Sequence, residues 1–323
     1  MAVRLLKVAV SLGLLGALAW VLDWGPILAT LAGARPGWVA LVVGLQAGVT
    51  VLATARWGLL LRRDEPAYTL GRLLPLGFIA ALFNNLLPSA TGGDLLRGYY
   101  VYRQSRSAAL AVSPIVTERV LGLAVMIGLA TAALPFLDLG HPLLAGVAGV
   151  LPWLFAAAFA GLLLAGWPRS YRPLHRFFER WSRFRPVSVL LRITEACHHY
   201  FNHAGVVAQL VLLSLALQGL EIVNFWLLGR AVGSELPLVT FLLVVPLVLV
   251  ASALPVTVGG LGLREAAAVS LLTLMGMTQG QAAAVSLLFL AALVLSSLPG
   301  LYFFLAMKDH GRFLKQAEEA EVV

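Results

Sequence analysis

The sequence predicts an all-α integral membrane protein of about eight hydrophobic elements, arranged as two inverted-topology repeats that each contain a re-entrant helical hairpin. Composition is the first reason, because 60% of the 323 residues are hydrophobic and only 12% are charged. This balance excludes an ordinary soluble domain. The second reason is a set of continuous apolar runs of about 20 residues, the length that crosses a hydrocarbon core as a helix. The third is a motif that occurs twice.

The repeated motif combines a proline with a glycine pair. Residues 87–97 read LPSATGGDLLR and residues 254–264 read LPVTVGGLGLR, so both copies fit L-P-x-x-x-G-G-x-x-x-R. Their prolines are separated by 255 − 88 = 167 residues, which is about half of the chain. Residues 109–113 (ALAVS) likewise resemble residues 282–286 (AAAVS). An internal duplication explains both similarities, and such repeats are common in transporters.

Basic residues set the expected orientation of the first helices. Arg4 and Lys7 precede an apolar run at 8–22, so the N-terminus is expected in the cytoplasm. A cleaved signal peptide is the weaker alternative. Residues 23–37 form the expected outer loop, and a helix at 38–61 returns to the cytoplasm. Four residues mark its basic cytoplasmic end: Arg56, Arg62, Arg63 and Arg72.

The next apolar run, at 73–87, is too short to cross the bilayer. It has 15 residues, or about 22 Å of helix, before Pro88 and the glycine pair interrupt it. The following segment at 94–102 leads to Arg103 and Arg106, which favour the cytoplasmic side that the chain has just left. We therefore expect a re-entrant hairpin with the motif at its tip. An ordinary pair of short spanning helices is the alternative.

A helix at 108–134 completes the first half, and the second half repeats the same order. Spanning helices are expected at 143–167, 206–228 and 282–307, and the two arms of the second hairpin at 238–254 and 261–275. A basic amphipathic helix at 169–192 is expected on the cytoplasmic membrane surface. The chain is thus predicted to be one membrane domain, 1–323, with a first repeat at 1–140, a second at 141–307 and a cytoplasmic tail at 308–323.

The two hairpins are expected to enter the membrane from opposite faces. The charge pattern places the first entry in the cytoplasm and the second outside. The halves therefore form an inverted-topology repeat, and their broken tips point toward the middle of the bilayer. Secondary transporters hold substrate in such a place.

Charged residues inside apolar segments cost about 2.5 to 3.5 kcal/mol each on insertion scales, so they need partners or a wet cavity. The candidates for a charge or coupling network are Asp94, Glu118, Arg119, Glu221 and Glu265. The candidates for substrate binding surround the motif tips: Asn84, Asn85, Gly92, Gly93, Arg97, Gly259, Gly260 and Arg264. A helix N-terminus and a guanidinium together suit a phosphate or carboxylate.

Internal pairing is the alternative role for these charges. Arg97 would then pair with Asp94 or Glu118, and Arg264 with Glu265 or Glu221. Such pairs would lock the hairpins without binding a substrate.

The remaining motifs argue against enzymes and metal sites. The sequence has no nucleophile elbow, Walker loop or nucleophile-base pair, so we expect no catalytic residue and no cofactor. Glu195, His199 and His203 have metal-compatible spacing, but a polar interfacial helix is the favoured interpretation, and no metal is expected. The single cysteine, Cys197, excludes an intrachain disulfide. The net charge of +8 is assigned to topology and anionic lipid contact rather than to nucleic acid.

These motifs resemble the lysylphosphatidylglycerol synthase/flippase membrane region. The resemblance covers nearly the whole chain and rests on residues 84–88 (NNLLP) with Gly92, Gly93, Asp94 and Arg97. It continues through 118–122 (ERVLG) and ends with 254–265, which includes Gly259-Gly260-Leu261-Gly262 and Arg264-Glu265.

The resemblance implies movement of a lipid between leaflets, and in fused members the lipid is aminoacylated phosphatidylglycerol. Those members carry a soluble aminoacyl-transferase domain after the membrane part. This chain ends at Val323, so lipid synthesis is not expected and the protein is expected not to be an enzyme. A phospholipid, a glycolipid or a polyprenyl-phosphate lipid is equally open as substrate.

The expected function is therefore a lipid flippase that works by alternating access in the inner or plasma membrane, with both termini cytoplasmic. Two other classes remain open: an intramembrane lipid-modifying enzyme and a non-transporting scaffold that recruits a lipid-synthesising enzyme. Membrane lipids are the expected partners. The sequence also leaves open whether the protein forms homo-oligomers.

Overall fold

A computed structural model describes residues 22–86, 92–166, 185–201, 203–253 and 262–307, with scattered single residues elsewhere. Every regular element in the described part of the chain is a helix, which confirms the predicted all-α class. Three predicted features lie wholly or mostly outside the described residues: the first helix at 8–22, the first part of the basic segment, and the tail at 308–323.

Five helical segments among the described residues are long and apolar enough to cross a bilayer. They are α3 (Pro36–Asp64), α6 (Ala108–Ala133) with the 3-10 turn η1 (Leu134–Phe136), α7 (Pro142–Gly166), α10 (Ala204–Ala231), and α13 (Gln279–Ser297) with α14 (Pro299–Ala306). The protein is therefore a multi-pass membrane protein, as predicted. The last segment divides into α13 and α14 at Pro299, which has no amide hydrogen to continue the helix.

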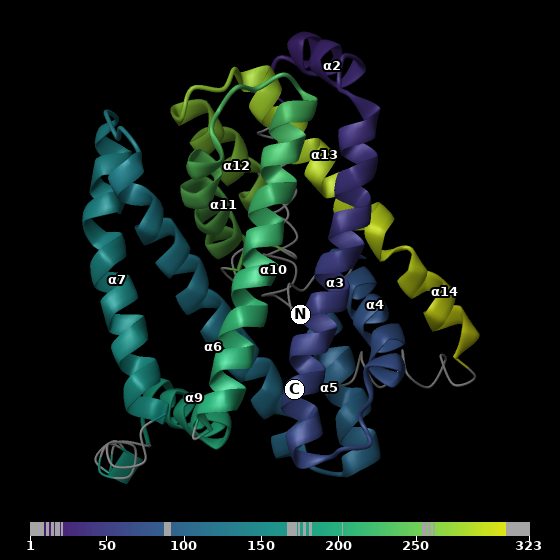
Figure 1. The fold of residues 1–323 in the computed structure, drawn as a ribbon, viewed down its shortest axis with the longest axis vertical. Coiled ribbons are helices and arrows are strands. Elements are labelled where there is room, and N and C mark those ends of the chain that lie inside the picture. The colour runs from purple at the N-terminus through teal and green to yellow at the C-terminus, as the bar shows by residue number, and fades with distance from the viewer. Residues whose placement is uncertain are drawn as a thin grey trace.

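The segment expected as an outer loop at 23–37 contains a helix, α2 (Trp24–Ala32), so this part of the prediction was wrong. The side chain of Asp23 accepts a hydrogen bond from the Gly25 amide at 3.1 Å and caps the helix. An aspartate before an apolar run is an N-cap signal. Figure 1 shows α2 across the upper end of α13, where the two helices are in contact.

Two pairs of shorter helices lie among the long ones. α4 (Leu70–Leu86) and α5 (Gly92–Ser105) occupy the lower half of Figure 1, and α11 (Leu238–Ala253) and α12 (Leu263–Leu274) occupy the upper half. α4 has 17 residues and α11 has 16, so each is about 25 Å long. Each pair therefore covers only part of the length of the molecule.

The 167-residue offset of the motif also relates the helix bounds. Adding 167 to the bounds of α3 gives 203–231, and α10 is Ala204–Ala231. The same addition to α4 gives 237–253, and α11 is Leu238–Ala253. It also carries α5 close to α12 and α6 close to α13. These helices thus follow the same order in the two halves, and the lengths match to one residue for α3 with α10 and for α4 with α11.

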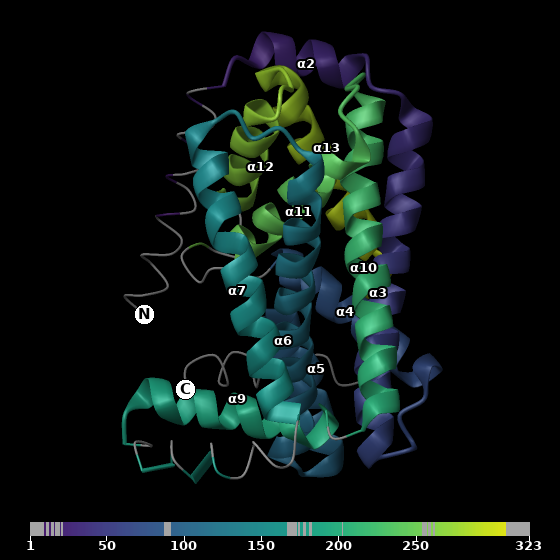
Figure 2. The same cartoon turned by 60° about the vertical axis from the view of Figure 1, so that its left-hand side comes forward.

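The two halves pack against each other in a reciprocal way. α3 runs beside α10 in the opposite direction, as Figures 1 and 2 both show. α6 of the first half packs on α11 of the second, and α14 of the second half packs on α4 of the first. Gly300 permits this last approach, because an added Cβ would collide with the carbonyl oxygen of Phe78. Each hairpin is therefore held by helices from both halves.

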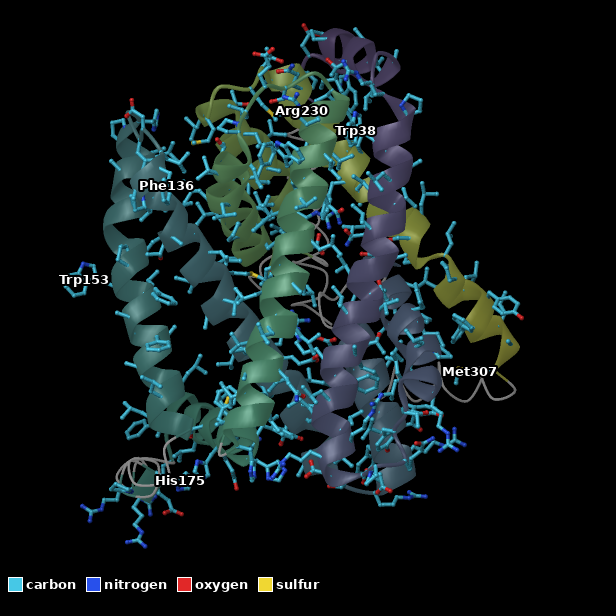
Figure 3. All side chains as sticks on the ribbon, in the orientation of Figure 1. Trp38, Phe136, Trp153, His175, Arg230 and Met307 are labelled. Atoms are coloured by element: carbon cyan, nitrogen blue, oxygen red, sulfur yellow. The ribbon has the colours of Figure 1, made fainter. Side chains whose placement is uncertain are left out.

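α7 lies at the edge of the bundle, where it packs on α6 and on a helix at the lower end. Only 6% of its most apolar stretch is buried. Trp153 is 77% exposed and points away from the molecule in Figure 3. This apolar, uncovered face is what a helix in contact with lipid presents.

The helix at the lower end is α9 (Arg185–Phe201), which lies across the ends of the long helices in Figure 2. The amphipathic helix predicted at 169–192 overlaps α9 only at 185–192, and α9 ends nine residues beyond the predicted end; most of 169–184 lies outside the described residues. Asp64 at the end of α3 holds it: the Tyr200 hydroxyl donates to one carboxylate oxygen at 3.1 Å, and His199 Nε2 lies 2.8 Å from the other. His203 contacts Arg63.

We predict that Gly93→Ala destabilises the protein. An added Cβ would collide with the Ala80 carbonyl oxygen where α5 passes α4, and overpacking costs about 1–3 kcal/mol. The melting temperature of the protein in detergent should fall. Gly98→Ala is the control on the same helix, because its Cβ would first meet the flexible end of Ile115 at 3.1 Å. Equal melting temperatures for wild type and Gly93→Ala would contradict the close approach.

We also predict that Cys197 reacts slowly with maleimide in the folded protein. It lies on α9, outside the membrane-crossing helices, and is 1% exposed. Burial raises the pKa of its thiol to about 11, although a hydrogen bond with Thr117 acts in the opposite direction. Because the thiolate is the reactive form, labelling should be slow at neutral pH and faster as the pH rises. Unfolding in SDS should make it complete; rapid labelling of native protein would contradict the burial.

Candidate functional site

Five charged side chains meet where α3, α5 and α6 converge in the lower half. We call them the first-half cluster: Arg56, Asp94, Arg97, Glu118 and Arg119. Asp94 and Arg97 are one turn apart at the start of α5, and Glu118 lies near the middle of α6. The hairpin and two long helices therefore each contribute charge.

Glu118 is the central acceptor of this cluster. One carboxylate oxygen accepts a hydrogen bond from Arg97 at 3.0 Å, and the other accepts one from Arg56 at 3.2 Å. Arg97 also lies 2.8 Å from one oxygen of Asp94, and Arg119 pairs with the other. Three arginines and two carboxylates give these five side chains a net charge of 3 − 2 = +1.

The cluster is buried on one side and open on the other. The guanidinium of Arg97 lies 5.1 Å from the ring centroid of Trp57, a cation–π distance. Arg56 donates to the hydroxyl of Ser214 on α10 at 3.0 Å. The Arg97 side chain is 13% exposed, whereas that of Arg119 is 47% exposed. A ligand that approaches the cluster from the protein surface would therefore contact Arg119 first.

The two asparagines before the first tip hold the hairpin in place. The side-chain oxygen of Asn84 accepts a hydrogen bond from the Gly93 amide at 2.8 Å, which ties α4 to the start of α5. Asn85 donates to the carbonyl oxygen of Leu293 on α13 at 3.1 Å. Asn85 thereby joins the hairpin to the second half. Gly92, the first residue of α5, is buried.

A second group of charges surrounds the start of α12. We call Glu221, Arg264 and Glu265 the second-half cluster. Arg264 lies 2.6 Å from one oxygen of Glu265, and the other oxygen accepts a hydrogen bond from the Gly262 amide at 2.6 Å. Arg264 also acts electrostatically on Glu221 of α10. Glu265 thus caps its own helix and neutralises its neighbour.

Glycines shape the second tip. Gly260 has φ +76° and Gly262 has φ +83°, values in the left-handed region that favour glycine. An added Cβ at Gly260 would also lie 2.8 Å from the Ser252 carbonyl oxygen. Gly259 lies outside the described residues.

Polar side chains join α3 to α10 beside the second-half cluster. Gln46 donates to one oxygen of Glu221 at 3.1 Å, and Asn224 donates to the side-chain oxygen of Gln46 at 2.6 Å. Exposure is 4% for Gln46, 8% for Glu221 and 0% for Asn224. The interface between the two halves therefore contains a buried hydrogen-bonded chain.

The internal pairing that the sequence suggested as an alternative is present in both halves. Arg97 pairs with both Asp94 and Glu118, and Arg264 pairs with Glu265. The structure thus places the two arginines in separate clusters. Their role in substrate binding remains a prediction.

Four members of these networks were not among the residues predicted from the sequence: Arg56, Gln46, Ser214 and Asn224. Arg56 was assigned to the basic cytoplasmic end, but its side chain is 11% exposed and pairs with Glu118, so that assignment was wrong. Its position inside the apolar run at 38–61, rather than after it, was the available signal. Gln46 and Ser214 carry no charge, and nothing in their local sequence indicated a partner.

An apolar groove begins beside the first-half cluster. It has a volume of about 960 Å³ and lies between α6, α7 and α10. Glu118 shares a helix face with the groove residues Leu121 and Val125, at spacings of three and seven. Ser214 lies one turn from the groove residue Val211. The groove residue Leu121 therefore lies one turn of α6 from Glu118.

Comparison with known proteins identifies the family. Residues 4–300 match the family described as the lysylphosphatidylglycerol synthase TM region. Two proteins of Methanothermobacter thermautotrophicus, both called UPF0104 membrane protein, are 26% and 25% identical over 294 residues. Each alignment covers 84% of this chain, and 83% and 86% of the respective relatives. No solved structure matches the chain. Because the family match includes both hairpins and both clusters, the chain belongs to the lysylphosphatidylglycerol synthase TM region family.

Proposed function

We propose that this protein is a flippase that moves an anionic lipid between membrane leaflets by alternating access. The observation that carries the proposal is the pair of short hairpins in opposite halves of the molecule, each with an arginine near the start of its second arm (Figure 1). Transporters built from inverted repeats bind substrate where such broken helices meet. The family description names a phospholipid, which supports a lipid as the substrate.

The charge distribution supports entry of the hairpins from opposite faces. Exposed arginines gather at the lower end of the molecule, at Arg62, Arg63, Arg72 and Arg103. Cytoplasmic loops are enriched in arginine and lysine, so this end is cytoplasmic in our proposal. The first hairpin then re-enters from the cytoplasm and the second from outside. The antiparallel course of α3 and α10 supports the proposal that the halves form an inverted-topology repeat.

The first-half cluster would bind the headgroup. Its net charge of +1 favours an anion, and the half-exposed Arg119 gives access. The acyl chains would remain in the apolar groove between α6, α7 and α10. An anionic phospholipid, a glycolipid and a polyprenyl-phosphate lipid all combine a polar head with an apolar tail, and each suits this arrangement.

Membrane topology provides the first test. Cysteines introduced at Thr69 and Gln104, which flank the first hairpin, should react with an impermeant maleimide from the cytoplasmic face. Cysteines at Glu235 and Gln279, which flank the second, should react from the outer face. All four positions are exposed, and buried Cys197 should add little background. Labelling of the two flanks of one hairpin from opposite faces would mean that the segment between them crosses the membrane an odd number of times, which would exclude a re-entrant hairpin there.

Lipid exchange in proteoliposomes provides the second test, with a panel of headgroup-labelled anionic lipids and Arg97→Lys. Lysine keeps the charge but lacks the planar guanidinium that here contacts Asp94 and Glu118. We expect exchange to slow by about tenfold, which is about 1.4 kcal/mol in the barrier. Arg97→Glu is less informative, because it would place a third carboxylate beside two others.

Arg103→Lys is the matched control, because Arg103 is exposed on the same helix. It should exchange lipid like wild type. A less stable Arg97→Lys protein with normal exchange per folded molecule would mean that Arg97 only locks the hairpin. If wild type exchanges none of the lipids, the flippase proposal is wrong. Mass spectrometry of the same lipids would then reveal any product made by an enzyme.

A further inference from the structure

The second-half cluster has more negative than positive charge. With all three groups ionised, one arginine and two glutamates give 1 − 2 = −1. Arg264 is paired directly with Glu265 at 2.6 Å, whereas it acts on Glu221 electrostatically. A buried carboxylate without a full counter-charge is strongly unfavourable. The cluster therefore lacks one positive charge.

Two buried oxygen atoms without hydrogen-bond partners indicate where a positive charge would bind. Glu221 and Asn224 lie one turn apart on α10, and both are hydrogen-bonded to Gln46 of α3. Glu221 Oε2, the second carboxylate oxygen, and Asn224 Oδ1, the amide oxygen, are buried and have no hydrogen-bond partner within the described part of the chain. Buried acceptors are normally satisfied. A cation is the kind of ligand that such unpartnered oxygens bind.

The helices around Glu221 offer few competing charges. α11 (Leu238–Ala253) and α13 (Gln279–Ser297) pack on α10 and contain no charged residue. On α3 and α6, Arg56, Glu118 and Arg119 belong to the first-half cluster. On α9, which meets the lower end of α10 (Figure 2), the titratable residues are Arg185, Arg192, Glu195, Cys197, His198, His199 and Tyr200.

We propose that Glu221, together with Asn224 and Gln46, binds a monovalent cation between α3 and α10, either a proton or a sodium ion. A proton on Glu221 Oε2 would make that oxygen a donor. A sodium ion would use both unpartnered oxygens, because hard cations prefer oxygen ligands. Either ligand brings the net charge of the second-half cluster from −1 to zero.

The location suits an ion that drives conformational change. α3 and α10 occupy equivalent places in the two halves, so the site lies at the interface between the repeats. Coupling ions of secondary transporters are held in such interfaces. Cation binding itself is independent of lipid transport, whereas a coupling role rests on the proposed flippase function.

Thermal unfolding of the purified protein in detergent tests the site without any lipid transport. Wild type is measured over a pH series, in sodium chloride and in N-methylglucamine chloride at equal ionic strength. A ligand that binds the folded state raises the melting temperature. Sodium binding should raise it by several degrees in sodium at neutral pH. Proton binding should instead make it rise as the pH falls, with no difference between the two salts.

Glu221→Gln should lose whichever response wild type shows, because its amide is neutral and does not titrate. Glu235→Gln makes the same substitution at an exposed position and should respond like wild type. Asn224→Leu provides a second variant if Glu221→Gln does not fold; it should weaken a sodium response by removing one ligand. The proposal is overturned if wild type responds to neither ion, or if Glu221→Gln responds as wild type does. Neither result depends on the flippase proposal, which the exchange assay tests separately.

Discussion

The bonding of Glu118 to two arginines is the interaction on which the first half of the structure most depends. Its two carboxylate oxygens join Arg56 of α3 to Arg97 of α5 through α6. Loss of one partner from a buried ion pair costs about 3–5 kcal/mol, because the remaining charge stays buried. The charges that would be expensive in a membrane thus fix the position of the hairpin against both long helices.

The same constraint applies to the backbone, because a broken helix frees amide and carbonyl groups that lipid cannot satisfy. The two halves solve this problem with different side chains. In the first, Asn84 accepts a hydrogen bond from the Gly93 amide; in the second, Glu265 accepts one from the Gly262 amide. The position 167 residues after Asn84 is Ala251, and the position 167 residues before Glu265 is Gly98. The repeated backbone therefore does not require repeated side chains.

The sequence was sufficient to predict what depends on local pattern. Apolar length predicted the long helices, and the repeated motif predicted where α4 and α11 end. The partners across helices could not be predicted in the same way. From the sequence, Arg56 was interpreted as part of the basic end of its helix, but in the structure it pairs with Glu118. The sequence around Gln46 does not indicate that its side chain bonds to Glu221 and Asn224. Such contacts depend on the rotation of each helix, which an apolar run with little amphipathic character leaves open.

The two clusters differ in the sign of their net charge. At the 167-residue offset of the motif, Glu221 falls on Thr54, which carries no charge. The first-half cluster has a net charge of +1 and the second −1, which suits an anionic headgroup in one and a cation in the other. Moving one elementary charge across a membrane potential changes the free energy by about 2.3 kcal/mol per 100 mV. A singly charged lipid anion and one cation that move in the same direction carry no net charge across the membrane. The membrane potential would therefore neither drive nor oppose this transport. The concentration gradient of the cation would supply the driving force.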